Sequence, residues 1–230
     1  MARTRKNKGP RRRKTLRGRK NSVDYPPDSI KRHIAHVVYI NLDSRKDRKE
    51  HTIKQLKVFD PKHVHRIPGV VDKTRPLLGS VKAHLHALEL AQRNGWENTL
   101  IMEDDCKWNN TKKSYPVFEN LLKKPYDVIM LSGTHSEFDK KTYKVHSSYS
   151  ASAYLVQKHY YTTLINKTKE VLRKYKPGMK SEDLAQDAGV FGPLQAADSW
   201  YIVSPSLCIQ INGHSNIQQG HIEYNKSGFA

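Results

Sequence analysis

Cysteine is scarce in this chain, whose 230 residues include only Cys106 and Cys208. Two cysteines so far apart do not have the paired spacing of a zinc site, which excludes that class of metalloprotein. They could in principle form a disulfide, but the amino-terminal segment lacks the apolar core of a secretory signal peptide. A reducing compartment is therefore favoured, and with it two free thiols.

Long apolar runs are also missing, because no stretch approaches the ~20 apolar residues that cross a bilayer. We therefore expect no transmembrane segment, no classical secretion and a cytoplasmic location. Phosphate-binding glycine loops are absent as well, since neither GxxxxGK[ST] nor GxGxxG occurs in the sequence. A phosphorylated ligand would have to be bound by a metal ion or by Lys and Arg side chains.

Acidic residues are outnumbered, with 22 Asp and Glu against 41 Lys and Arg and a formal net charge of +19. Residues 1–20 contain eleven of the basic residues and no acid, so we expect a disordered tail and linker over residues 1–27. Such a tail either contacts a polyanion, such as nucleic acid or an anionic surface, or serves only solubility or sorting. Residues 28–230 are long enough for one folded domain.

The folded part alternates between apolar, β-branched stretches and segments with helical spacing. The first kind predicts strands over residues 34–40, 64–71, 99–102, 127–131, 150–156 and 207–211. The second kind predicts helices over 45–58, with Ile53 and Leu56 on the inner face, over 79–93 and over 158–174. This order predicts an α/β fold with a mixed, mostly parallel, Rossmann-type sheet flanked by helices.

Three consecutive acids follow one of these strands, in the segment LIMEDD at residues 100–105. If the segment is extended, Glu103 and Asp105 lie on the same side and can ligate Mg²⁺ or Mn²⁺ together, while Asp104 points elsewhere. The alternative is an ordinary acidic turn after a strand. The like charges repel unless a cation is near, which makes the acids a candidate metal site.

Other polar residues follow other strands, namely Asn41 and Asp43 after the first and Ser132 after the fourth. Ligands of parallel sheets bind at the carboxyl ends of the strands, so these residues should share one rim with the acids. Arg45 and Arg48 begin the next helix, where they could meet a diphosphate. The alternative is a solvated basic face of that helix.

These motifs together resemble glycosyltransferase family 25, which includes lipooligosaccharide and procollagen galactosyltransferases. The segment YINLDSRKDR at residues 39–48 is similar to the opening motif of the family, and LGSVKAHL at 78–85 is similar to its second block. The third block corresponds to residues 100–105. Further similar segments occur in the family's order at 127–133, 151–155, 197–198 and 212–217.

The chain departs from the family at Ser80 and Ala83, where Cys and Ser are usual, and at Asn216, where Asp is common. The acceptor site is therefore the part that transfers least. The resemblance implies a GT-A fold, a UDP-sugar donor and inversion at the anomeric carbon. It also implies a divalent metal on Glu103 and Asp105, and a nucleotide that lies near the side chains of Asn41, Asp43, Arg45, Arg48 and Asp104.

An inverting transfer needs a base that takes the proton of the acceptor hydroxyl. Asp198 is the candidate, because it is distant in sequence from the acids and adjacent to Trp200 and Tyr201, whose rings could stack on a sugar. The alternative is a helix-capping Asp beside core aromatics. His214, in a loop after the last strand, is a candidate third metal ligand, although a lone His is commonly structural or solvated. For His84 we expect burial against the sheet.

The sequence thus predicts a metal-dependent glycosyltransferase that moves galactose or glucose from a UDP-sugar to a hydroxyl of a glycan or glycoprotein. Compact cytosolic glycosyltransferases of this kind occur in bacteria and in large DNA viruses, and the basic leader favours a viral member, acting in the host cytoplasm or the virion. One alternative is a polyanion-binding protein that acts through its tail and keeps a non-catalytic nucleotide-sugar-binding domain. Another is an enzyme that hydrolyses the sugar nucleotide without an acceptor.

Overall fold

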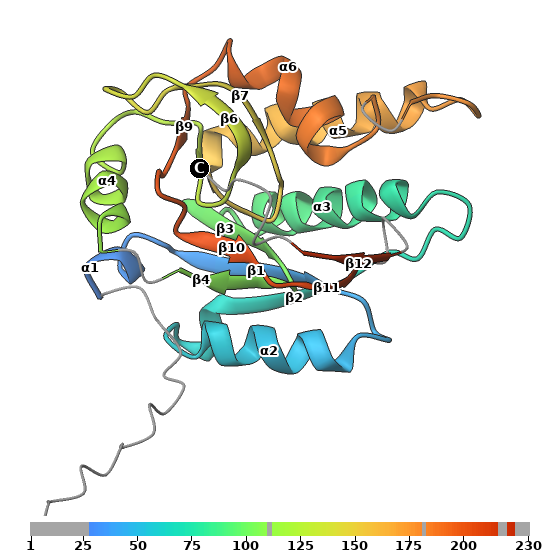
Figure 1. Ribbon diagram of the computed structural model, residues 1–230, viewed down its shortest axis with the longest axis horizontal. Coiled ribbons are helices and arrows are strands. Elements are labelled where there is room, and N and C mark those ends of the chain that lie inside the picture. Colours follow the sequence, from blue (N-terminus) through green and yellow to red (C-terminus); the bar gives the residue numbers. More distant parts are fainter. Residues whose placement is uncertain (1–27, 110–111, 181–182, 216–219, 224–230) are drawn as a thin grey trace, which may run out of the picture.

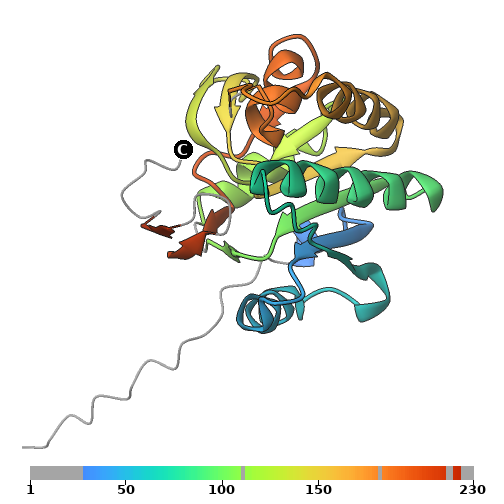
Figure 2. The ribbon, with the colours of Figure 1, turned by 90° about the vertical axis from the view of Figure 1, so that its right-hand side faces the viewer.

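A computed structural model describes residues 28–109, 112–180, 183–215 and 220–223. The predicted tail of residues 1–27 lies outside these described residues, as do Asn216 and Ile217 of the last family-like segment. The chain folds into three layers, with a central sheet between two sets of helices (Figures 1 and 2).

The first half of the described chain contains nine elements. They are α1 (Asp28–Lys31), β1 (His36–Asn41), α2 (Lys46–Leu56), the 3₁₀ turn η1 (Pro61–His63), β2 (Val64–Pro68), α3 (Pro76–Arg93), β3 (Asn98–Glu103), β4 (Cys106–Trp108) and α4 (Ser114–Leu121).

The second half contains shorter strands and one long helix. Its elements are β5 (Val128–Met130), β6 (Thr134–Phe138), β7 (Val145–Tyr149), β8 (Ala153–Gln157), the 3₁₀ turn η2 (Lys158–Tyr160), α5 (Tyr161–Lys174), the π-helix η3 (Gln186–Phe191), α6 (Gly192–Gln195), β9 (Trp200–Ile202), β10 (Cys208–Gln210), β11 (Gly213–Ser215) and β12 (Gly220–Ile222).

The central sheet has six strands in the order β2-β1-β3-β8-β5-β9. β1 runs parallel to β2 and β3, and β5 runs parallel to β9, whereas β8 is antiparallel to both β3 and β5. All strands except β8 therefore end at the same edge of the sheet. The predicted α/β fold with a mixed, mostly parallel sheet is confirmed.

The two faces of the sheet are buried in separate cores, as the alternation of side chains along a strand requires. Val38 of β1 and Ile101 of β3 pack against α3 and α5, while Val37 and Leu100 pack on the opposite face, where α2 and α4 lie. Figures 1 and 2 show α3 and α5 on one side of the sheet and α2 on the other. Burial on both faces explains why these strands are almost continuously apolar.

Five of the six predicted strands belong to the central sheet, but the sixth does not. The predicted strand at 207–211 forms β10, which pairs with β4 in a separate two-stranded sheet. The sheet is completed instead by β9, a strand of three residues that sequence analysis missed. Its segment is too short to show a period, so only pairing with β5 defines it as a strand.

The helix predicted from residue 79 begins three residues earlier, at Pro76, whose fixed φ suits the first turn of a helix. In α2 the predicted inner face is partly wrong. Leu56 is buried, but Ile53 is 45% exposed, and the other buried residues of α2 are Thr52 and Gln55. This helix turns a polar stripe toward the sheet because it packs over the turn that carries the acids.

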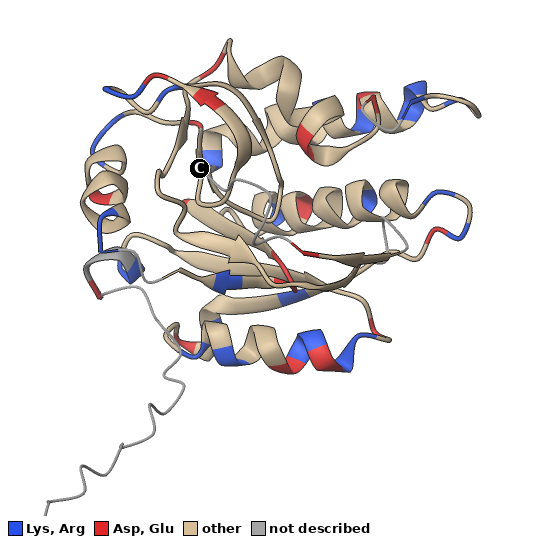
Figure 3. Ribbon diagram, viewed as in Figure 1, with Lys and Arg blue, Asp and Glu red and all other residues tan. Residues whose placement is uncertain are grey.

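Charged residues lie on the helices, on the loops and on some strands, and α2 carries both signs (Figure 3). Among the described residues, no helix combines the length and the low polarity that a bilayer-spanning segment requires.

Candidate functional site

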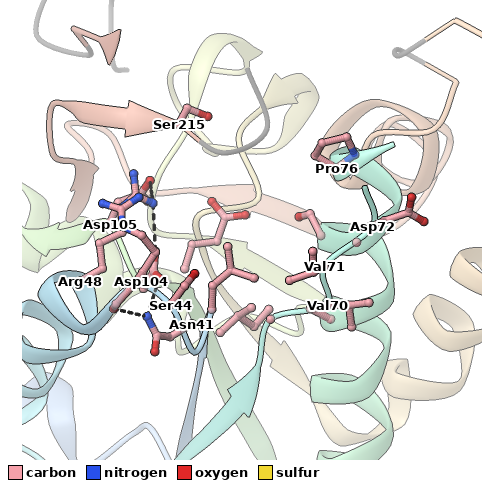
Figure 4. Close-up of a pocket in the computed structure, with 18 of the residues that line it drawn as sticks. Asn41, Ser44, Arg48, Val70, Val71, Asp72, Pro76, Asp104, Asp105 and Ser215 are labelled. Atoms are coloured by element: carbon pink, nitrogen blue, oxygen red, sulfur yellow. Dashed lines mark hydrogen bonds and ion pairs between the residues drawn. The ribbon is translucent and has the colours of Figure 1, made fainter. Parts of the chain in front are cut away.

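The carboxyl ends of β1 and β3 open into a cavity of about 410 Å³. This size falls in the range of small-molecule sites. Six of the predicted site residues line it, namely Asn41, Arg45, Arg48, Glu103, Asp104 and Asp105. Figure 4 shows Asp104, Asp105 and Arg48 on one side of the cavity, Val70, Val71 and Pro76 on the other, and Ser215 above.

The apolar side of the cavity is formed by the loop between β2 and α3. Gly79 lets this loop lie directly on α3, because a Cβ at that position would be 2.2 Å from the carbonyl oxygen of Val70. Asp72 and Lys73 of the same loop also line the cavity, so this wall combines the apolar side chains of Val70 and Val71 with two charged ones.

Arg48 is the centre of the opposite wall. Its Nη1 donates to Asp104 Oδ1 at 3.0 Å and to Asp105 Oδ2 at 2.9 Å. The side chains of the three residues are only 7–12% exposed. One guanidinium thus donates to two buried carboxylates, which is the strong, charge-assisted kind of hydrogen bonding, and its single positive charge leaves one negative charge uncompensated when both are ionised.

Backbone geometry at the acids differs from the expected extended segment. β3 ends at Glu103, residues 104 and 105 form a turn, and β4 begins at Cys106. We expected Glu103 and Asp105 to share one side of an extended strand and Asp104 to point elsewhere. Because residues 104 and 105 form a turn, strand alternation does not apply to them, and the expectation for Asp104 is wrong. The turn brings all three acids to the cavity.

Burial makes ionisation of these acids costly. It raises the pKa of Asp105 to about 7, with the negative charge of Glu103 as the second cause. Burial also raises the pKa of Asp104, against the opposing hydrogen bonds from Asn41 and Arg48. For Arg48 burial acts to lower the pKa, but the charges of Asp105 and Asp104 outweigh it and the pKa ends above its ordinary value. The negative charges of the buried acids repel one another, and an additional cation would stabilise their ionised forms.

Asn41 connects the first strand to the acids, since its Nδ2 donates to Asp104 Oδ2 at 2.7 Å. Its oxygen accepts from Arg66 of β2 at 3.2 Å, and Arg66 also pairs with Asp43. The Asp43 side chain is 78% exposed and is not part of the cavity lining. Of the two residues predicted at the end of the first strand, Asn41 lines the cavity, whereas Asp43 is exposed outside it.

Arg45 and His214 meet, but not through the imidazole. Arg45 Nη1 and Arg48 Nη2 donate to the backbone oxygen of His214 at 3.1 and 2.8 Å. The His214 residue is exposed, and its place on β11 is opposite His221 of β12. The structure therefore uses His214 to attach β11 to the rim and does not bring its ring into the cavity lining.

Residues of α2 that contact the backbone of the acidic turn were not predicted from the sequence. Thr52 Oγ1 donates to the backbone oxygen of Asp104 at 3.0 Å, and His51 Nε2 lies 2.9 Å from the backbone oxygen of Cys106. Gln55 binds both the backbone and the indole of Trp108. Polar residues spaced three and four apart on an otherwise charged helix were the available signal.

Ser132 lies at the same rim, as predicted. Its Oγ lies 2.7 Å from Ser152 Oγ, and the backbone oxygen of Ser152 accepts from the backbone nitrogen of Glu103 at 2.8 Å. The ends of β1, β3 and β5 therefore meet at one edge of the sheet.

Asp198 lies elsewhere. It precedes β9, which runs parallel to β5, so it lies at the edge where those strands begin. Its carboxylate accepts from the hydroxyl of Tyr160, and its backbone oxygen accepts from Lys144. The structure does not bring Asp198 to the cavity, because strand direction places it at the opposite edge of the sheet.

The carboxylates of Glu103 and Asp105 have the chemistry that a hard divalent cation requires. Within the described residues no group of three His, Cys, Asp or Glu side chains is arranged to hold a metal ion. Two protein carboxylates are nevertheless the usual number for Mg²⁺ or Mn²⁺ that is bound together with substrate phosphates. The oxygen donors of Glu103 and Asp105, both in the cavity lining, fit such an ion.

Comparisons with protein-family models and with curated proteins give no match. Among solved structures, a glycosyltransferase involved in the glycosylation of the major capsid of PBCV-1 aligns with 77% of this chain and 93% of its own, at 10% identity and a TM-score of 0.51. A mannose-1-phosphate geranyltransferase from Thermus thermophilus aligns with 74% of this chain and 73% of its own, at 11% identity and a TM-score of 0.47. The first likeness shows the fold, which is GT-A-like.

Proposed function

We propose that this protein is a glycosyltransferase of family 25 type that transfers galactose or glucose from a UDP-sugar to a hydroxyl of a glycan or glycoprotein. The observation that carries the proposal is the cavity at the ends of β1 and β3, where Arg45 and Arg48 lie beside Glu103 and Asp105. Cations and carboxylates at one rim can bind a diphosphate and its metal ion together. The likeness in fold to a glycosyltransferase supports the reaction class.

In this proposal Glu103 and Asp105 hold Mn²⁺ or Mg²⁺. When bound, the ion would neutralise the charge that develops on the diphosphate oxygens as the glycosidic bond breaks. Arg48 keeps Asp105 in place through the 2.9 Å hydrogen bond, and Arg45 adds positive charge at the same rim. The side chains of Val70 and Val71, on the opposite wall, are available to the uracil ring.

The test is UDP release from UDP-galactose and UDP-glucose by the purified protein, with Mn²⁺ or with EDTA. We expect release only with the metal, and a loss of about 10²–10³-fold in kcat for Asp105→Ala, the size found when one electrostatic stabiliser is removed. Asp198→Asn, at the other edge of the sheet, is the control and should keep its turnover. Metal-independent release, or an unaffected Asp105→Ala, would contradict the proposal.

The basic segment of residues 1–20 supports a separate proposal for the tail, namely contact with a polyanion. Deletion of residues 1–22 distinguishes the two activities. A transferase keeps its turnover without the tail, whereas a protein that acts only through polyanion binding loses its affinity for heparin or DNA and has no turnover to keep.

A further inference from the structure

Glu103 differs from the other two acids in its partners. Its side chain is 24% exposed and lines the cavity, and among the described residues its carboxylate is not within ion-pair distance of any Lys or Arg. Its contact is with His84 of α3, whose Nε2 lies 3.4 Å from Glu103 Oε1. This is the long end of a hydrogen bond, and such bonds in sites without ligand commonly tighten when the ligand binds.

His84 is completely buried and has a second contact on its other ring nitrogen. The hydroxyl of Tyr154, on β8, lies 3.1 Å from His84 Nδ1. Tyr154 is also completely buried, and burial, with the charge of Glu103 as the second cause, raises the pKa of its hydroxyl well above the ordinary value. The phenol therefore keeps its proton.

The donors and acceptors in this chain of contacts allow one consistent assignment. An ionised carboxylate only accepts, so the proton of the His84–Glu103 contact must be on Nε2. In a neutral imidazole Nδ1 is then an acceptor, and it receives the Tyr154 proton. In an imidazolium both nitrogens would donate, and the buried Tyr154 hydroxyl would have no acceptor among the described residues, which is costly.

We propose that His84 is a positioning residue, which Tyr154 holds as the Nε2–H tautomer and which fixes the Glu103 carboxylate at the cavity. One carboxylate oxygen is engaged by His84, and among the described residues no hydrogen bond engages the other. That oxygen is available to a cation. The tautomer of His84 follows from the hydrogen-bond geometry alone. The effect of His84 on catalysis rests on the proposed function.

The arrangement explains why a His from the middle of α3 is buried against the sheet. The predicted burial of His84 is confirmed. Its contact with Glu103 gives the buried imidazole a second role besides packing, which is to orient a carboxylate at the cavity. Residues behind a metal ligand orient it and set its basicity, and their loss lowers metal affinity or activity by about 10- to 100-fold.

The tautomer is tested directly by long-range ¹H–¹⁵N NMR on the full chain labelled at histidine. The His84 signals are assigned by their disappearance in His84→Gln. We expect the proton on Nε2 in the wild type, and a mixture of tautomers in Tyr154→Phe. A proton on Nδ1 in the wild type would overturn the proposal, and this measurement does not depend on turnover.

The consequence is tested by calorimetric titration with Mn²⁺ and UDP. His84→Leu should weaken binding by about 10- to 100-fold, while His84→Gln, whose amide can replace the Nε2 donor, should recover much of the affinity. Tyr161→Phe is the matched control, since the Tyr161 hydroxyl is also buried and contacts Thr99 at 2.8 Å, near the start of the same strand β3.

Wild-type affinity in His84→Leu, or equal weakening in Tyr154→Phe and Tyr161→Phe, would overturn the positioning role. The melting temperature of each variant shows whether a loss of binding reflects a loss of folding. A protein with the expected tautomer and Mn²⁺ affinity but no UDP-sugar turnover would contradict the proposed function and leave the positioning role of His84 intact.

Discussion

The two edges of the central sheet carry similar residues with different consequences. At the carboxyl edge, Asp104 and Asp105 are buried against Arg48 beside an open cavity. At the amino edge, Asp198 binds Tyr160, and Asp127 binds His159 at 2.7 Å and the backbone nitrogen of Ser199 at 2.7 Å. At the amino edge the acids accept hydrogen bonds from groups near the first residues of the strands. At the carboxyl edge the acids lie close together around a cavity that a ligand can fill.

An acid beside aromatic residues is therefore not a site by itself. Both edges offer carboxylates, and both have hydrogen-bonded partners. The difference is strand direction, because parallel strands deliver the ends of β1, β3 and β5 to one rim and leave the loops there to form a cavity. Three experiments test how far the two edges differ.

The largest effect is expected for Arg48→Ala, which leaves two buried carboxylates without their cation. Removal of one partner of a buried ion pair costs about 3–5 kcal/mol. His159→Ala, at the amino edge, removes a hydrogen-bond contact with Asp127 from a side chain that is 64% exposed, and should cost about 1 kcal/mol or less. Urea unfolding at pH 8 measures both, and equal costs would show that the two edges are energetically alike.

A smaller effect is expected from pH. Because the pKa of Asp105 is raised from 3.8 to about 7 in the folded protein, the unfolded chain loses this proton first as pH rises. Stability should therefore fall between about pH 4 and pH 7 and fall no further through this group above that range. Asp105→Asn removes the titration, so its melting temperature should fall less over the same window.

Mn²⁺ provides the control for this pH effect. A metal that binds the folded protein raises its melting temperature. At pH 8 the rise should be larger for the wild type than for Asp105→Asn. Parallel melting curves for the two proteins across the whole range would contradict the assignment of the pH dependence to Asp105.

The smallest effect is expected for Asp198→Asn. The Asn oxygen can still accept from Tyr160, so the cost in stability should be about 1 kcal/mol or less. Turnover should be unchanged, because Asp198 lies at the edge opposite the cavity. A large loss of turnover with a normal melting temperature would return Asp198 to the role of the base and remove the distinction between the two edges.

Much of the fold followed from local patterns. Apolar strands at 99–102 and 127–131 and the helix at 158–174 were predicted because each is long enough, or apolar enough, to show its own period. β9 and β4 were not, since three residues define no period and pairing alone makes them strands. α4 was also missed. The strand at 207–211 was expected in the main sheet, because its sequence does not indicate that it pairs with β4 in a separate sheet.

The candidate site divides in the same way. Asn41, Arg48 and the three acids were predicted as neighbours because they follow strands that end at one rim. Arg66, Thr52 and His84 were missed as parts of the site, since each acts through a partner that is distant in sequence, on another element. Asp43 was grouped with the site because it follows a strand, Asp198 because of its aromatic neighbours, and His214 because it follows the last strand. None of these signals carries information on the direction in which a side chain or a strand points.

Side-chain period and strand-end position are local properties, so the α/β sheet with acids and arginines at the ends of its first strands could be predicted from the amino-acid order. Which acids share the cavity, and which cations and imidazoles contact them, depends on how distant elements pack together. The turn at 104–105, the direction of β9 and the approach of α3 to β3 set those distances, and a distance between elements depends on packing that no single segment contains.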